Sequence, residues 1–213
     1  MDLNYLTDVD AGRKAAIAVP SSRLPGDWPT DPDQIFELPG YWREAAEMPG
    51  DVRERGSLAR EHLWEMADQA GQGDRPWTEV MIASFAWGYV SAPYGPFRLR
   101  RILTDAANSA VLESSLLAAA GELHQDAISA YRLLRTRRED GGVRLKWYGP
   151  AFFTRFLFAA GGPGRPACIL DQVRADAVRR FTDDPSLLRG SDWSTEEYAF
   201  YVGFVHELAA CRS

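Results

Sequence analysis

The sequence predicts an all-α protein with an irregular, Pro-rich N-terminal segment. Beyond residue 76, apolar residues recur at helical spacing, and clusters of Gly or Pro separate one apolar stretch from the next. No stretch alternates apolar and polar residues for long enough to indicate a strand. Because 46% of the 213 residues are hydrophobic and 12% are aromatic, the chain is expected to bury a core of its own.

Two regions are expected. Residues 1–75 are predicted to form an acidic segment that packs on the rest of the chain, because aromatic residues are interleaved with its prolines. A short helix is expected at 7–19 and a regular helix at 51–70, while six prolines interrupt residues 20–49. Residues 76–213 are predicted to form the helical domain.

The helices of this domain follow from their apolar patterns and their end signals. The first covers residues 77–90 and ends at a Pro/Gly loop, 92–96. A turn with two glycines closes at 140–142. Ser194 and Glu197 have the spacing of a capping box at the start of the last helix. Further helices are therefore expected at 97–103, 105–120, 122–138 and 194–211.

The most informative stretch is a turn, a buried helix, a loop and then a carboxylate. Gly149 is expected to give the backbone a sharp turn, and Pro150 suits the first position of a helix, where a missing N–H costs nothing. Residues 151–160 are apolar on more than one face, so this helix is predicted to be buried on most sides, with Arg155 as its one charge. Asp171 then precedes a helix that is basic toward its end, and Asp is a favoured N-cap.

This arrangement resembles the helix-hairpin-helix DNA glycosylases, specifically the bacterial 8-oxoguanine DNA glycosylase (OGG) fold family. The resemblance consists of a Gly-containing hairpin near 143–160, an apolar helix, a short loop, and Asp171 where the superfamily has its catalytic aspartate. The stretch 77–91 is similar to the helix that these enzymes place beside the base pocket. The resemblance implies a protein that binds duplex DNA with a flipped base and hydrolyses the N-glycosidic bond, with Asp171 as the catalytic carboxylate.

The sequence departs from the family pattern in two respects. Trp147 stands where the first hairpin glycine is usual, and Ala151 and Phe152 occupy the usual place of the catalytic lysine. Lys146, one of two lysines in the chain, is the remaining candidate for a Schiff-base nucleophile, or else a solvated lysine near a turn. We therefore expect a mono-functional enzyme that leaves abasic sites intact.

The charge distribution favours DNA contact around the hairpin, although the chain has a net charge of −6. Residues 127–180 hold eleven Lys/Arg and four Asp/Glu, a net charge of +7, whereas the regions on either side are acidic. A basic segment in an acidic chain suits phosphate contact, although its arginines would equally solvate a helix face. The residues predicted to contact DNA are Gly149, Trp147, Arg135, Arg138, Arg144 and Arg155.

Aromatic residues around the end of the 77–90 helix are candidates for the base pocket. Trp87 and Tyr89 are predicted to face a pocket and stack on a base. Tyr94, in the loop that follows, is the candidate to fill the gap left by a flipped nucleotide. The alternative for these residues is packing in the core.

Other chemistries are not indicated. The three histidines lie far apart, with no Cys or carboxylate at ligand spacing, and nucleotide-binding glycine motifs are missing, so no cofactor or metal is expected. No apolar run approaches the length of a membrane span, and the N-terminus has no signal pattern, which predicts a cytoplasmic protein. The competing hypothesis is a non-catalytic module that binds DNA or a protein partner in a defence or regulatory system, with Asp171 as a helix cap only.

Overall fold

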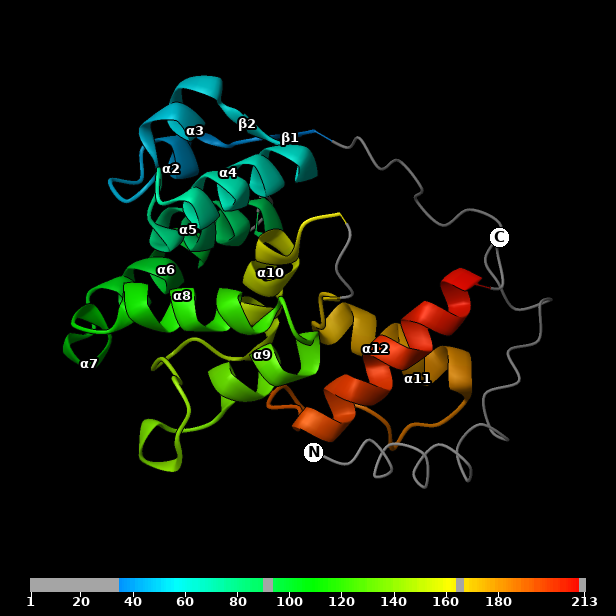
Figure 1. Cartoon of the computed structure of the whole chain (residues 1–213). Helices are drawn as coiled ribbons and strands as arrows, with labels where there is room; N and C mark the ends of the chain where they lie inside the picture. The colour runs from blue at the N-terminus through cyan, green and yellow to red at the C-terminus, as the bar shows by residue number, and fades with distance from the viewer. Residues whose placement is uncertain (1–34, 90–93, 164–166, 211–213) are drawn as a thin grey trace.

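The protein is an assembly of packed helices with a two-stranded sheet at one end (Figure 1). The computed structural model describes residues 35–89, 94–163 and 167–210. Its α-helices are α2 (Gly40–Arg43), α3 (Gly50–Arg55), α4 (Arg60–Gln72), α5 (Trp77–Gly88), α6 (Tyr94–Leu103), α7 (Ala106–Ser109), α8 (Leu112–Glu122), α9 (Ala127–Arg135), α10 (Pro150–Gly161), α11 (Gln172–Thr182) and α12 (Thr195–Ala210). The 3₁₀ helix η2 (Arg138–Asp140) follows α9, and β1 (Phe36–Glu37) pairs antiparallel with β2 (Ser57–Leu58). The all-α prediction is confirmed.

Helix α10 lies in the middle of the molecule (Figure 1). It packs against α4, α5, α8 and α9, and Phe153, Phe156 and Leu157 are buried along it. The ring of Phe156 meets the edge of Trp77 on α5, with their centroids 5.9 Å apart. The predicted burial of this helix on most sides is therefore confirmed, and Arg155, its one charged residue, is buried with it.

The described part of the N-terminal region also contributes to the core. Trp42 is fully buried beside Phe85 of α5, and its indole N–H donates to the carbonyl of Tyr89 at 3.1 Å. The predicted single helix at 51–70 is wrong. Gly56 takes a left-handed conformation (φ 70°) that ends α3 and starts the β2 pairing, so α4 begins only at Arg60. The helix predicted at 7–19 lies outside the described residues.

The last helix, α12, covers one side of α9. Helix α12 packs against α9, where the rings of Tyr131 and Tyr198 stack with centroids 4.1 Å apart. The predicted capping box is confirmed, because the Ser194 amide donates to Glu197 Oε2 at 2.7 Å and the Glu197 amide donates to Ser194 Oγ at 3.1 Å.

Two other predicted helices have different bounds. The predicted helix at 105–120 divides into α7, which Asp105 caps by accepting from Ala107 N at 3.0 Å, and α8, because Val111 between them has the non-helical φ of −133°. The predicted helix at 122–138 starts later, where Asp126 caps α9 through the amides of Ile128 and Ser129. In the portion of the chain that the structure covers, no helix has the length and apolar character needed to cross a membrane.

Candidate functional site

The hairpin turn before α10 has its unusual backbone conformation at Trp147. Trp147 has a φ of 67°, in the left-handed region that favours glycine. Gly149 has φ −84° and ψ 177°, an extended conformation that any residue adopts, and it is the N-cap of α10. The sharp turn predicted at Gly149 therefore belongs to Trp147, the position where the family pattern has its first glycine. Pro150 occupies the first turn of the helix, as predicted.

Side chains from the α6–α7 region hold this turn. The buried Asn108 accepts from the Lys146 amide at 2.8 Å and donates to the Lys146 carbonyl at 3.0 Å, so it pairs with both backbone groups of one residue. Asp105 accepts from the Trp147 indole at 3.0 Å and lies 3.1 Å from Lys146 Nζ. The hydrogen bond from Lys146 lowers the pKa of Asp105. The guanidinium of Arg101 lies over the Trp147 ring, 3.4 Å from its centroid.

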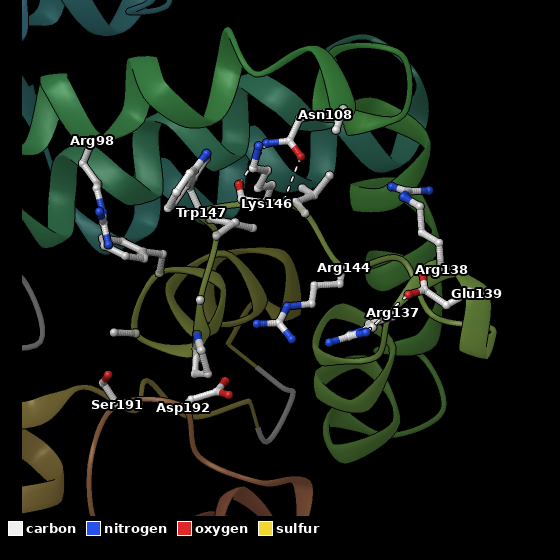
Figure 2. A pocket seen from close by; sticks show the side chains of 17 residues that line it. Arg98, Asn108, Arg137, Arg138, Glu139, Arg144, Lys146, Trp147, Ser191 and Asp192 are labelled. Carbon is white, nitrogen blue, oxygen red and sulfur yellow. Dashed lines mark hydrogen bonds and ion pairs between the residues drawn. The ribbon is translucent and has the colours of Figure 1, made fainter.

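An open pocket of about 1030 Å³ lies beside this turn (Figure 2). Figure 2 shows Arg137 and Arg144 extending between the hairpin and the loop that carries Asp192. The pocket is lined by the whole turn from Arg144 to Phe152 together with side chains of α6, α7, η2 and the 191–192 loop. Its charged residues are five basic ones and two acidic ones: Arg98, Arg137, Arg138, Arg144, Lys146, Glu139 and Asp192.

Several groups of this pocket are available to a ligand. Within the described residues, the side chain of Arg144 forms no hydrogen bond or ion pair, and the amides of Trp147, Gly149 and Ala151 donate to no acceptor. A Cβ on Gly149 would meet no atom within 4 Å. Neither backbone conformation nor internal packing therefore requires glycine at this position, whereas the close approach of a ligand to the backbone would.

The two arginines predicted on the helix before the hairpin have partners of their own. Arg135 donates from Nε to the Trp193 carbonyl at 2.7 Å and lies 3.7 Å from the Asp192 carboxylate, so it ties α9 to the loop before α12. Arg138 lines the pocket and donates to the buried Ser115 hydroxyl at 2.6 Å. Arg144 is exposed and has no such partner among the described residues, and the exposed Arg137 lies 3.6 Å from the equally exposed Glu139 carboxylate.

Asp171 lies at the N-terminus of α11 and caps it, accepting from the Arg174 amide at 3.0 Å. Its other oxygen, Oδ2, accepts from Arg155 Nη2 at 2.9 Å and from Arg174 Nη1 at 2.7 Å. The Asp171 and Arg155 side chains are 11% and 9% exposed, whereas that of Arg174 is 44% exposed. The carboxylate is thus bound to one buried cation on α10 and one cation at the surface.

Two residues at the C-terminal end of α5, Gly88 and Tyr89, contact the Arg155 side chain. The guanidinium lies 4.8 Å from the centroid of the Tyr89 ring and also donates to the carbonyl of Ala151. Gly88 lies against the same side chain, and a Cβ at Gly88 would overlap the Nε and Cδ atoms of Arg155. Glycine at this position therefore makes the room in which Arg155 reaches Asp171.

The predicted base-pocket residues do not meet at one place. Tyr89 stacks on Phe152 at 5.5 Å and lies beside Arg155, which binds Asp171. Trp87 stacks on Phe158 at 5.9 Å, farther along α10. Tyr94 is 55% exposed in the first turn of α6, not in a loop, and its ring lies 5.5 Å from that of Phe97. The loop prediction for 92–96 was wrong at Tyr94, and residues 90–93 lie outside the described part.

Lys146 and Asp171, the two predicted catalytic residues, do not line the same pocket. Lys146 lines the open pocket and is paired with Asp105, whereas Asp171 is not among the residues lining that pocket. Phe152, at the usual position of the catalytic lysine, stacks face to face on Phe85 with centroids 4.8 Å apart. That position is therefore part of an aromatic cluster on the pocket side of α10.

Comparison with known proteins assigns the chain to a family. A family model described as "Putative 8-oxoguanine DNA glycosylase OGG-like protein" matches residues 18–212. The chain belongs to this family. The predicted membership of the OGG fold family is confirmed, and it makes the protein DNA glycosylase-like, with DNA as the substrate of the family. No curated protein and no solved structure matches the chain.

Sequence reasoning missed several residues of this candidate site. Asn108 and Gly88 gave no usable signal, because their partners lie 38 and 67 residues away in the chain or are known only after folding. Arg174 could have been found from the sequence, because an Asp followed by an Arg three residues later has the spacing of an ion pair at the start of a helix. Arg98 was missed because the pocket joins segments that are distant in the sequence.

The contact between Gly88 and Arg155 predicts opposite effects for the same substitution at two helical glycines. Gly88→Ala is expected to lower the free energy of unfolding by about 1–3 kcal/mol, because the new methyl group displaces a buried side chain. Gly203→Ala on α12, where a Cβ would meet no atom within 4 Å, is expected to raise it by about 0.5–1 kcal/mol. Urea unfolding of both variants measures the difference, and equal effects would contradict the assigned role of Gly88.

Proposed function

We propose that this protein is a mono-functional DNA glycosylase that excises a damaged or modified base, with Asp171 as its catalytic carboxylate. The observation that carries the proposal is the environment of Asp171: a buried carboxylate at a helix N-terminus, after the hairpin helix, bound by two arginines. Breaking the bond between the base and C1′ of the deoxyribose develops positive charge on the sugar. A fixed carboxylate beside C1′ stabilises that charge, and water completes the hydrolysis by attacking C1′.

The two arginines have different roles in this proposal. Arg155 is buried and fixes Asp171 from inside the protein. Arg174 covers the carboxylate from the solvent side and is the more exposed partner. A DNA phosphate competes for the Arg174 guanidinium, so binding of the sugar-phosphate backbone draws Arg174 away from Asp171 Oδ2. This oxygen then faces the sugar while Arg155 keeps Asp171 in place.

The hairpin pocket supplies the contact to the DNA backbone. The unpaired amides around Gly149 and the cations Arg144 and Arg137 offer hydrogen bonds and positive charge to phosphate oxygens. Such contacts carry no information on base sequence, so they hold the strand in place while the aromatic residues near Asp171, Tyr89 above all, contact the flipped base.

A second candidate function is a DNA-binding module without catalysis. It is favoured by the fact that both oxygens of Asp171 already bind groups of the protein itself, as expected of a structural cap. The two functions share the hairpin contacts and differ only in the fate of the base, which the next experiment measures.

Asp171→Asn is expected to lower base excision by about 10³-fold, because the charge that stabilises the sugar cation is removed. The variant keeps a helix cap but leaves Arg155 without its counter-charge, so stability should fall by about 3–5 kcal/mol. The double variant Asp171→Asn with Arg155→Met removes both charges and serves as the control for unfolding. Release of abasic sites is measured on duplexes that each carry one modified base, 8-oxoguanine among them.

The outcomes of this experiment separate the two functions. A wild-type protein that removes a base, with both folded variants inactive, supports the catalytic role of Asp171. An Asp171→Asn variant as active as the wild type would exclude Asp171, and a wild type that binds every duplex but excises nothing would favour the binding module.

DNA affinity is expected to depend on salt through the hairpin pocket. Arg144→Gln removes one phosphate contact, so binding should weaken on every duplex and the slope of log K against log salt should fall by about 1. The matched control is Arg180→Gln, which changes the same charge on an exposed part of α11 outside the pocket. Fluorescence anisotropy titrations at several salt concentrations measure both slopes. Equal slopes for the two variants would place the DNA surface elsewhere.

No strand cleavage is expected after base removal. A lysine must attack the sugar carbon to cleave the strand, but Lys146 is held in an ion pair with Asp105 beside the hairpin turn. Arg155 does not replace it, because a guanidinium stays protonated. Treatment with borohydride during the reaction should therefore trap no covalent complex. A trapped complex that disappears in Lys146→Gln would instead identify Lys146 as a nucleophile.

A further inference from the structure

The chain immediately before Asp171 is buried without belonging to a helix or strand. Residues 167–170 are irregular, and Ala167, Ile169 and Leu170 are each less than 7% exposed. Buried backbone groups outside regular structure need hydrogen-bond partners, because an unpaired buried amide or carbonyl costs free energy. Three consecutive residues of this segment find these partners in side-chain hydroxyls.

Two of the hydroxyls come from α12. The Tyr198 hydroxyl donates to the Cys168 carbonyl at 2.9 Å and accepts from the Cys168 amide at 3.2 Å. The Tyr201 hydroxyl donates to the Ile169 carbonyl at 2.7 Å. The two tyrosines are three residues apart and so lie on one face of the helix. Burial raises the pKa of both tyrosines, so their hydroxyls remain protonated donors even above the pH at which an ordinary tyrosine ionises.

The third hydroxyl comes from α10. Thr154 is fully buried, and its Oγ1 accepts from the Leu170 amide at 3.1 Å. The same atom lies 2.8 Å from the Pro150 carbonyl and 3.2 Å from the Leu170 carbonyl, and its one proton serves either acceptor. Thr154 precedes Arg155 in α10, so adjacent residues of the hairpin helix hold the backbone before Asp171 and the carboxylate itself.

We infer that Thr154, Tyr198 and Tyr201 are positioning residues that fix Asp171 relative to the hairpin helix. The inference rests on the proposed catalytic role of Asp171. A segment without its own regular structure is located by these three hydroxyls, and Asp171 is covalently attached to its last residue. Because a displacement of about 1 Å at a reacting group can cost on the order of 100-fold in rate, loss of a hydroxyl impairs catalysis more than it impairs DNA binding.

The chain offers a matched control for this inference. Tyr131 is as buried as Tyr198 and stacks against it, and its hydroxyl donates to the Trp193 carbonyl at 2.7 Å. Tyr131→Phe therefore removes one buried hydroxyl from the same aromatic cluster without touching residues 168–170. Thr154→Ser keeps the hydroxyl and serves as the conservative replacement beside Thr154→Val.

The test measures the single-turnover excision rate and the dissociation constant on a duplex from which the wild type removes the modified base. Thr154→Val and Tyr201→Phe are expected to lower the excision rate by about 10–100-fold and to leave the dissociation constant within about twofold. Tyr131→Phe and Thr154→Ser are expected to stay close to the wild-type rate. Unchanged excision in Thr154→Val and Tyr201→Phe, or an equal loss in Tyr131→Phe, would overturn the inference.

Amide hydrogen exchange tests the same inference independently of catalysis. Exchange in the peptide covering residues 167–174 is expected to accelerate in Thr154→Val and Tyr201→Phe, and to remain unchanged in Tyr131→Phe. Unchanged exchange in the first two variants would show that the hydroxyls do not hold the segment. If exchange accelerates but Asp171→Asn excises at the wild-type rate, the proposed function fails and the inference that depends on it fails with it.

Discussion

The buried ion pair between Arg155 and Asp171 is the constraint on which the centre of this structure depends. Burying a guanidinium in an apolar helix is costly unless a counter-charge and hydrogen bonds accompany it, and removing one partner of such a pair costs about 3–5 kcal/mol. Three elements are adapted to it: α10 carries the arginine, α11 begins at the carboxylate, and α5 has Gly88 where a larger residue would collide. The pair therefore fixes the positions of these three helices relative to one another.

The hairpin shows how a turn that usually needs glycine is built with tryptophan. A left-handed conformation costs about 1–2 kcal/mol for a residue with a Cβ, and Trp147 has it. Its side chain gains a hydrogen bond to Asp105 and a contact with Arg101, and Asn108 holds the preceding residue through both backbone groups. These contacts offset the strain, so loss of the glycine at this position does not mean loss of the hairpin.

The sequence predicted the parts of the fold that local pattern decides. Apolar residues on several faces identified α5 and α10, and the preference of Asp for the N-cap placed Asp171 at the start of α11. Local pattern failed where a single backbone conformation intervened, as at Gly56, which interrupts the predicted 51–70 helix. It also failed for the site, because the partners of Asn108 and Arg155 lie 38 and 16 residues away and only folding brings them together. The spacing of residues along one helix reveals only neighbours three or four residues apart. Most contacts in this site join residues that are farther apart in the sequence.

The overall acidity of the chain is compatible with DNA binding because its charges are segregated. A net charge of −6 disfavours contact with a phosphate backbone overall, while five of the seven charged residues around the hairpin pocket are basic. In the proposed complex this contrast confines the duplex to the hairpin face, where the free amides around Gly149 lie. Repulsion elsewhere then aids function: it disfavours orientations in which the DNA contacts the acidic surface and the catalytic carboxylate faces away from the sugar.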